Sequence, residues 1–287
     1  MDKQFQFSGL SSISDVQYIE RNGINEVLEK QQQEFLEKRD LFLKSKYTKK
    51  WPLDTLHTWS RVWEYPYVYY NIKNWKEQYF EKRNPKVIDV GSGVTFFPLS
   101  IAKLGCDIQC IDIDGEYGES ILEATKQIPV SPGNMGFTLS DGVNLPFKNE
   151  EIDIAYSVSV LEHIPDPSHT IQEIHRVLKK NALFILTIDL DLLGNSDIGV
   201  EKYYKLVSLL EEKFEYVFPE RAVHPADILY SDYGKYAFPY PHKKIQGIDK
   251  IWFFIKQWCI KPLVGKRPSS LPPELLLSVQ GFVFKKR

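Results

Sequence analysis

Short apolar segments alternate with amphipathic stretches through the middle of the chain. In the helix predicted over 167–178, Ile171, Ile174 and Leu178 share one face. The apolar segments are rich in β-branched residues, as in strands covered on both faces. Strands alternating with helices in this way predict a parallel sheet with helices on both faces. The predicted strands are 86–90, 107–111, 138–141, 152–158, 182–188, 214–218 and 275–284.

The first 80 residues follow a different pattern and predict an N-terminal helical cap. Apolar positions recur at helical spacing from 14 to 44, so we expect a helix there that packs outside the main domain or serves in dimerisation. The next segment is rich in Trp and Tyr, which bury a large area and keep a polar end. We expect this segment to pack onto the sheet. The alternative is a lid over a ligand, with Arg61 binding a carboxylate and Tyr65 or Tyr67 lining the acceptor pocket.

The segment 86–105 joins a predicted strand to a predicted helix through a glycine turn. Gly91 and Gly93 allow a sharp backbone turn and leave room for a ligand beside main-chain atoms. Thr95 can cap the following helix, and Gly105 can end it. Open α/β sheets bind ligands at such strand-to-helix turns.

The next predicted strand ends at Asp112, roughly 20 residues beyond the glycines, where dinucleotide folds bind a ribose diol. A nicotinamide site would need a third glycine, but Phe96 occupies that position, and the sequence has no G-x-x-x-x-G-K-[ST] phosphate loop. These residues favour a ligand with an adenosine ribose and no phosphate, such as S-adenosylmethionine (SAM).

Several motifs within 86–190 together resemble those of class I SAM-dependent methyltransferases, most closely the broad subgroup that methylates small molecules. The resemblance implies a Rossmann-like α/β fold with a seven-stranded, mostly parallel sheet, helices on both faces and an antiparallel last strand. The sequence departs from the family at Thr95, where a third glycine is common, and at 179–182, where Lys-Lys-Asn-Ala replaces Lys-Pro-Gly-Gly. The motifs are Asp89-x-Gly91-x-Gly93, Asp112, Asp141-Gly142, Leu145-Pro146-Phe147, Val160-Leu161-Glu162-His163-Ile164 and Arg176-Val177-Leu178-Lys179.

The resemblance implies which residues bind the methionine part of SAM. Gly91, Ser92 and Gly93 would face it, and Asp89 would support this loop or bind the ammonium group through water. Ser157, at the end of the fourth predicted strand, would offer its carbonyl oxygen to the ammonium group.

The resemblance also implies how the adenosine part is bound. Asp112 would accept hydrogen bonds from the ribose hydroxyls, with Ile113 beside it. Asp141 would accept a hydrogen bond from the adenine amine, next to the Gly142 backbone.

The motifs after the fourth predicted strand exclude several acceptors. The sequence lacks the Asn/Asp-Pro-Pro-aromatic motif of DNA amino-methyltransferases, a Pro-Cys nucleophile for pyrimidine C5 and the paired-glutamate loop of arginine methyltransferases. We therefore expect O-methylation of a small polar acceptor such as a sugar, a glycan precursor or a natural-product hydroxyl. The alternatives are N-methylation of a small amine and a SAM-binding protein without catalysis.

A hydroxyl acceptor needs a base, and His163 is the catalytic candidate. It follows the fourth predicted strand and titrates near neutral pH, although a histidine at this point of the family motif is often structural. Asp189, Asp191 and His224 are further candidates. No metal is expected; in the alternative, Asp189 and Asp191 would hold Mg²⁺ with another oxygen ligand.

Net charge and cysteine usage exclude other classes of partner and site. A net charge of −2 gives no general attraction to nucleic acid, and three cysteines without metal or disulfide spacing predict a cytoplasmic protein.

The segment 248–264 predicts a helix that packs on the domain or on a second copy, or lies on a membrane surface. The oligomeric state is not predicted. The expected organisation is a cap at 1–80, a SAM-binding core at 81–218, an insertion shaping the acceptor site at 219–273 and a final core strand at 274–287.

Overall fold

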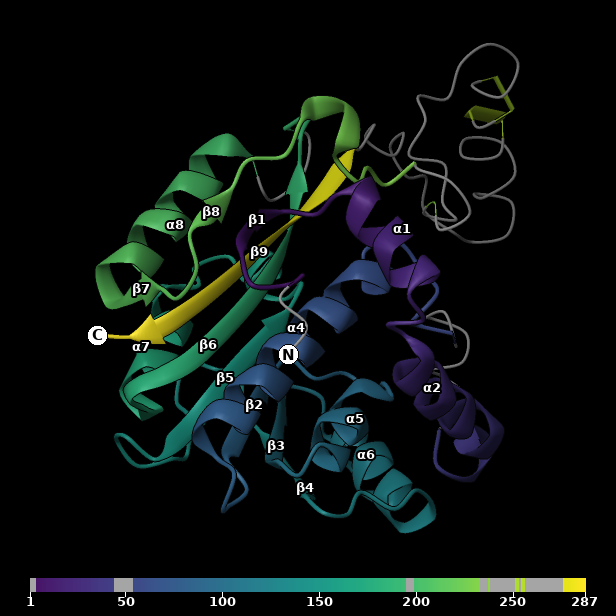
Figure 1. The fold of residues 1–287 in the computed structure, drawn as a ribbon, viewed down its shortest axis with the longest axis vertical. Coiled ribbons are helices and arrows are strands. Elements are labelled where there is room, and N and C mark those ends of the chain that lie inside the picture. Colours follow the sequence, from purple (N-terminus) through teal and green to yellow (C-terminus); the bar gives the residue numbers. More distant parts are fainter. Residues whose placement is uncertain are drawn as a thin grey trace.

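The computed structural model describes residues 4–43, 54–194, 199–232, 237, 251–252, 254–255 and 276–287 (Figure 1). Helices flank a central, mostly parallel sheet, which confirms the predicted α/β fold. The helices are α1 (Ile13–Arg21), α2 (Glu26–Lys38), α4 (Arg61–Tyr79), α5 (Phe97–Lys103), α6 (Gly115–Gln127), α7 (Ser168–Val177) and α8 (Val200–Lys213), with short 3-10 helices η1 (Arg39–Leu41), η2 (Leu161–His163) and η3 (Pro225–Asp227). The strands are β1 (Ser8–Leu10), β2 (Lys86–Val90), β3 (Asp107–Asp112), β4 (Asn134–Leu139), β5 (Ile152–Val158), β6 (Leu178–Asp191), β7 (Phe214–Tyr216), β8 (Glu220–Arg221) and β9 (Leu277–Lys286).

The sheet has the strand order β4-β3-β2-β5-β6-β9-β1-β8, with β7 pairing β9 beside this path. Strands β2 to β6 run parallel to one another, and β9 runs antiparallel to β6, as predicted for the last strand. The carboxyl ends of the parallel strands therefore meet at one edge of the sheet, which is where an α/β sheet of this kind binds ligands.

Some elements differ from the sequence prediction. The sheet contains β1 and β8 in addition to the seven predicted strands. The helix expected over 14–44 is broken into α1 and α2, where Gly23 adopts a φ of +60°. The third strand runs earlier than 138–141 because Asn134–Leu139 pairs with β3 in register, while Ser140 leaves the ladder.

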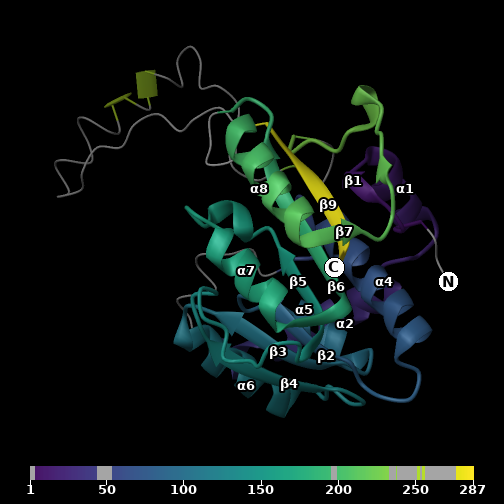
Figure 2. The same cartoon turned by 90° about the vertical axis from the view of Figure 1, so that its left-hand side faces the viewer.

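Two hydrophobic clusters cover the two faces of the sheet. One contains α4, α5 and residues of α1, α2 and α6, and the other contains α7 and α8. Figure 2 shows α7 and α8 on one side of the sheet and α1, α2 and α4 on the other. The first cluster runs from Phe5 to Val283 and so includes residues from both sides of the predicted boundary after residue 80; the domain division itself stays a prediction.

Helix α4 lies closely against the sheet. Most of its residues are buried, as expected for a helix with no polar face. It contacts β5, β6 and β9, and Gly281 of β9 makes this approach possible. A Cβ at Gly281 would lie 2.7 Å from Tyr67 and 2.8 Å from Trp63. The position of α4 therefore depends on the absence of a side chain at one residue of the last strand.

Candidate functional site

The glycine loop after β2 is held against β3 and against the segment after β5. The amides of Gly91 and Ser92 donate to the carbonyl oxygen of Ile111 at 2.9 and 3.1 Å. Gly91 and Gly93 have φ values of +81° and +55°, which favour glycine. A Cβ at Gly91 would lie 2.5 to 3.0 Å from the side chain of Val160. The loop is thus packed directly beside the residues that follow β5.

Asp112 ends β3 and faces this loop. One carboxylate oxygen accepts from the Gly93 amide at 3.0 Å, and the other accepts from the Asp114 amide at 3.2 Å. Each carboxylate oxygen has a second lone pair, so the group can still accept from two hydroxyls. Ile113 is 75% exposed beside it. This arrangement suits the ribose diol that the sequence predicts here, and Asp112 at the same time fixes the loop.

Asp89 lies in β2 beneath the loop and is buried. The Tyr156 hydroxyl donates to its Oδ2 at 2.8 Å. Burial, together with the negative charge of Asp112, raises the pKa of Asp89 to about 8. Asp89 is buried under the loop. This position fits the predicted role of supporting the loop better than the alternative of binding the ammonium group through water.

Asp141 and Gly142 form a turn beside the end of β3. Asp141 is exposed, and its Oδ1 accepts from the Val143 amide at 2.9 Å. Gly142 has a φ of +80°, and a Cβ there would lie 3.1 Å from Thr170 of α7. The buried Thr170 hydroxyl has no hydrogen-bond partner among the described residues. This turn therefore offers a carboxylate, a bare backbone and an unused hydroxyl within a small region.

Two other predicted residues, Ser157 and His163, lie in and shortly after the end of β5. Ser157 is fully buried inside β5, which continues to Val158, and its hydroxyl donates to the Val90 carbonyl oxygen at 2.9 Å. His163 is exposed in η2, and its amide donates to the Val160 carbonyl oxygen at 2.9 Å. The roles assigned to both residues stay predictions.

A polar cluster that the sequence did not predict as a unit lies at the carboxyl ends of β5 and β6, where α4 crosses the sheet. Its charges come from both α4 and the strand ends. It consists of Arg61, Glu64, Ser159, Glu162, Thr187 and Asp189, and we call it the strand-end cluster.

Glu64 is at the centre of the strand-end cluster and is fully buried. Its Oε1 accepts from the hydroxyls of Ser159 at 2.6 Å and Thr187 at 2.5 Å. Its Oε2 forms an ion pair with the Arg61 guanidinium. Arg61, which the lid hypothesis assigned to a ligand carboxylate, is therefore paired within the chain.

Glu162 and Asp189 form the other acidic part of the strand-end cluster. The Asp189 amide donates to Oε1 of Glu162 at 2.8 Å. Oε2 of Glu162 is buried and has no hydrogen-bond partner among the described residues. Burial, followed by the charge of Asp189, raises the pKa of Glu162 well above its usual range. Burial, followed by the charge of Glu64, raises the pKa of Asp189 to about 7, against the opposing effects of Arg61 and the Ser159 hydroxyl.

The remaining base and metal candidates have other partners. Asp191 is buried, and its Oδ1 accepts from the Leu193 amide at 3.1 Å. His224 accepts from the Ala226 amide at 3.2 Å and caps η3. Within the described ranges, no group of three or more His, Cys, Asp or Glu residues is arranged to hold a metal ion.

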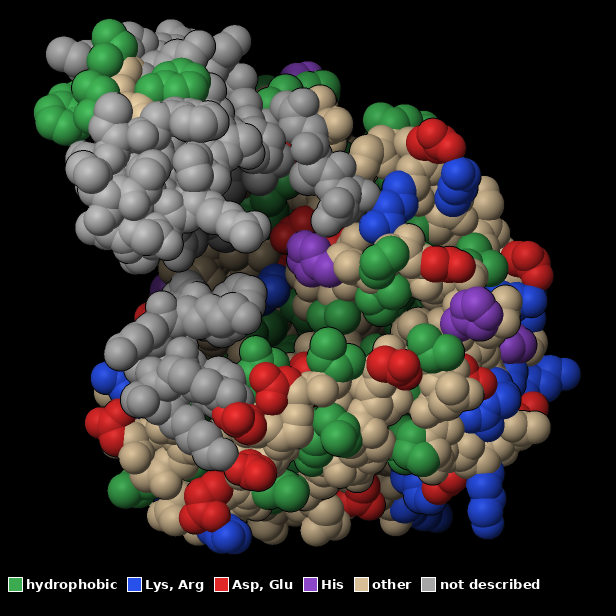
Figure 3. All heavy atoms as spheres, turned by 180° about the vertical axis from the view of Figure 1, so that it is seen from behind, with side chains coloured by type: hydrophobic (Ala, Val, Ile, Leu, Met, Phe, Trp, Pro, Cys, Tyr) green, Lys and Arg blue, Asp and Glu red, His purple; other side chains and the backbone are tan. Residues whose placement is uncertain are grey.

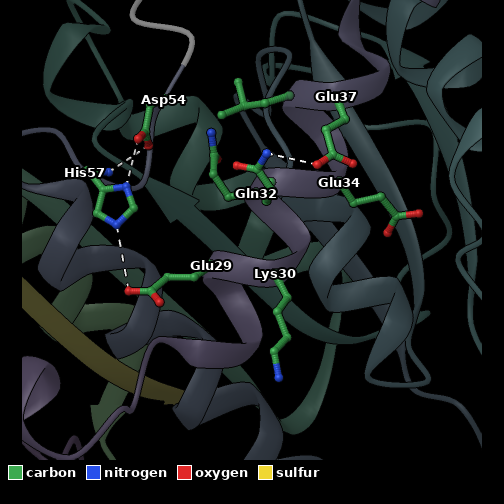
Figure 4. A pocket seen from close by; sticks show the side chains of 9 residues that line it. Glu29, Lys30, Gln32, Glu34, Glu37, Asp54 and His57 are labelled. Carbon is green, nitrogen blue, oxygen red and sulfur yellow. Dashed lines mark hydrogen bonds and ion pairs between the residues drawn. The ribbon is translucent and has the colours of Figure 1, made fainter.

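A hollow of about 570 Å³ lies along α2, apart from the residues named above (Figure 4). His57 and Asp54 point toward each other there, with Nδ1 of His57 2.8 Å from Oδ2 of Asp54. Its lining includes no residue of the glycine loop or of the strand-end cluster. The lining residues are Glu29, Lys30, Gln32, Gln33, Glu34, Leu36, Glu37, Asp54 and His57.

The face seen from behind is hollowed near its middle, with hydrophobic and charged side chains around the hollow (Figure 3). Most of the predicted insertion, and most of the helix predicted at 248–264, lies outside the described residues. The described residues of that helix, Ile251, Trp252, Phe254 and Ile255, are 40% to 61% exposed. None of the described helices is long and apolar enough to cross a membrane.

Comparison with known proteins supports the family that the motifs resemble. Residues 88–186 match the family model of a methyltransferase domain. An uncharacterised methyltransferase of Mycobacterium leprae is 30% identical over 119 residues, 41% of this chain and 42% of that protein. A demethylmenaquinone methyltransferase of Staphylococcus saprophyticus is 28% identical over 118 residues, 39% of this chain and 50% of that protein. The chain thus spans half or less of the length of these relatives.

A solved structure agrees in fold. The crystal structure of the [4+2]-cyclase SpnF aligns with a TM-score of 0.50 at 16% identity, over 76% of this chain and 80% of that one. The family match covers the glycine loop, Asp112 and Asp141. Residues 88–186 are thus similar to a methyltransferase domain, and SAM is the expected cofactor.

Proposed function

We propose that the protein is a SAM-dependent methyltransferase that methylates a hydroxyl group of a small polar acceptor, such as a sugar or a natural product. The methyltransferase domain supports the reaction class. The strand-end cluster supports a polar acceptor, because it brings polar groups close to the glycine loop. Its member Ser159 directly precedes Val160, and the Val160 side chain packs against Gly91 of that loop.

The described residues fit SAM. The glycine loop presents bare backbone at Gly91 and Gly93, and Asp112 keeps lone pairs for two hydroxyls. The turn at Asp141 and Gly142 lies next to the unused hydroxyl of Thr170, so it can take a flat group with polar edges. When bound, SAM supplies a methyl group on a positively charged sulfur, which an oxygen nucleophile displaces in line.

The chain contributes mainly by positioning, which can lower the barrier to a displacement by several kcal/mol. The glycine loop and Asp112 would fix the donor. The strand-end cluster would orient the acceptor through hydroxyl and carboxylate groups fixed by the pairing of Glu64 with Ser159, Thr187 and Arg61. A small acceptor is favoured because most of these groups are buried.

Calorimetry with SAM and its demethylated product tests the donor site. Asp112→Ala should weaken SAM binding about 10- to 100-fold, because it removes a charged acceptor of two hydrogen bonds. Glu123→Ala removes an acid from the exposed side of α6 and serves as the control with unchanged affinity. If the unaltered protein gave no heat with either ligand, the proposed function would be wrong.

A turnover screen tests the acceptor class. Methyl transfer from SAM is measured to sugar nucleotides, phenols and small amines. The proposal expects product with a hydroxyl acceptor. Transfer only to amines would make the protein an N-methyltransferase instead.

A further inference from the structure

The strand-end cluster contains three carboxyl groups, Glu64, Glu162 and Asp189, and they differ in what they can still bind. Glu64 is fully buried and accepts from two hydroxyls besides its ion pair with Arg61. Its bonding capacity is taken up inside the protein, so it is unsuited to receive a proton from a substrate.

Glu162 is 1% exposed and has one engaged and one unpartnered oxygen within the described part of the chain. Burial raises the pKa of Glu162 well above its usual range and so favours its neutral form, which can donate a hydrogen bond. Its engaged oxygen accepts from the Asp189 amide, so it fixes the backbone at Asp189.

Asp189 is the accessible member of the three carboxyl groups. It is half-buried, and its Oδ1 lies 3.3 Å from the Ser159 hydroxyl, which is closer to Glu64. Asp189 comes two residues after Thr187 of β6, which pairs with Val158 at the end of β5. Ser159 is followed by Val160, whose side chain packs against Gly91. The carboxylate is therefore partly exposed at the end of β6, and Ser159 links it to the segment that packs against the glycine loop.

We propose that Asp189 is the general base of the reaction and that Glu162 and Ser159 are its positioning residues. This inference rests on the proposed function. As the acceptor oxygen attacks, its O–H bond breaks and the proton passes to the Asp189 carboxylate. The new O–C bond forms to the methyl group, the S–C bond breaks, and its electron pair stays on sulfur. The products are a methyl ether, the neutral thioether and a protonated Asp189 that releases its proton to water.

Asp189 suits this role because its pKa of about 7 lets it accept a proton and release it near neutral pH. Besides burial, the groups that set this pKa are Glu64 and Arg61 of α4 and the Ser159 hydroxyl. Glu162 of η2 also interacts with Asp189, whose charge raises the pKa of Glu162. The neighbouring elements also carry Tyr65 of α4, Asp191 of β6 and Lys202 of α8, whose Nζ donates to the Glu162 carbonyl oxygen at 2.8 Å.

The first test uses the sugar nucleotide or phenol that the turnover screen identifies. In the unaltered protein, kcat/KM should rise with pH up to about 7 and then level off, because only the ionised carboxylate accepts a proton. Asp189→Asn keeps the shape of the side chain and should lower kcat at least 100-fold, abolish this rise, and leave SAM affinity and thermal stability nearly unchanged. The matched control is Asp40→Asn, at a side chain that is 87% exposed beside Arg39, which should keep both kcat and the pH profile. His163→Gln tests the other base candidate.

Retention of more than a third of kcat in Asp189→Asn would overturn the proposal, as would a pH profile that moves with His163→Gln. The second test needs no acceptor. Carboxyl-carbon NMR of the SAM-bound protein should show an aspartate titrating near pH 7, distinct from Asp89 near pH 8, whose signal is absent from Asp189→Asn. An ordinary, low titration point for that signal would also overturn the assignment. A failed turnover screen with a positive NMR result would count against the proposed function rather than against the proton-accepting group.

Discussion

At the scale of single residues, Gly91 and Gly93 play different parts in one loop. Both have positive φ, but a Cβ at Gly93 would meet no atom within 4 Å among the described residues, whereas a Cβ at Gly91 would overlap Val160. Gly93 serves chiefly the backbone turn that brings its amide to Asp112. Gly91 allows the close contact between the glycine loop and the segment after β5.

Gly91→Ala should therefore be the more damaging substitution. Both alanines carry the cost of a left-handed backbone, about 1–2 kcal/mol, and Gly91→Ala adds a steric overlap with Val160. We expect Gly91→Ala to weaken SAM binding more than 10-fold beyond Gly93→Ala, measured by calorimetry. Adding Val160→Ala to Gly91→Ala should restore part of the affinity. If the two single variants bound SAM equally, contact with Val160 would not matter for the loop.

The residues proposed for the SAM site could be predicted from the sequence to lie together, because they follow strands at fixed spacing. Gly91, Gly93 and Asp112 lie within one strand-turn-helix-strand unit, and local patterns suffice to bring them together. The strand-end cluster was not readable as a unit. Glu64 follows Arg61 at helical spacing, but nothing local indicates that α4 carries both to Ser159 and Thr187, which lie far along the chain. The pKa of Asp189 depends on that long-range contact.

At the scale of elements, the alternation of apolar and amphipathic segments predicted the parallel strands and their helices. It missed β1 and β8 because strands of three and two residues leave no periodic pattern. The sixth predicted strand ends earlier than expected, at Tyr216. Strand β6 starts earlier than 182, at Leu178, and its pairing with β5 shifts register there, next to the positive φ of Asn181.

Packing of α4 on β9 gives an element-scale prediction. Gly281→Ala should destabilise the protein by about 1–3 kcal/mol, since the new methyl group would push against the rings of Tyr67 and Trp63. Denaturant unfolding followed by circular dichroism measures the change. The control is Gly115→Ala at the start of α6, where the nearest atom is 3.9 Å away and stability should change by less than about 0.5 kcal/mol. An equal effect of both substitutions would refute the close packing.

At the scale of the whole molecule, Asp15 connects segments from both ends of the chain. It is 1% exposed. Its carboxylate accepts from the Trp63 indole at 3.0 Å, the Ser12 amide at 3.2 Å and two Arg221 nitrogens at 2.6 and 2.8 Å. Arg221 also lies over the Phe7 ring, 3.5 Å from its centroid. One carboxylate thus ties α1 to α4 and β8.

Asp15→Ala should cost about 3–5 kcal/mol of unfolding free energy, because it leaves a half-buried guanidinium and a buried indole without their acceptor. Asp40→Ala is the matched control: that side chain is 87% exposed beside Arg39, so its loss should cost at most about 1 kcal/mol. Urea unfolding of both variants measures the difference. A loss for Asp15→Ala as small as that for Asp40→Ala would show that this network does not hold the segments together.

Strand β9 lies between β6 and β1, so it is the shared partner of an early and a late part of the sheet. Ser8–Leu10 leaves the ribosome before Leu277–Lys286. The strand β1 therefore has no edge of β9 to pair with until Leu277–Lys286 has been synthesised. Meanwhile α4 can dock on β5 and β6 but not on its Gly281 contact. Such long-range pairing is slow to form, so we expect the closure of this sheet to be a late step in folding.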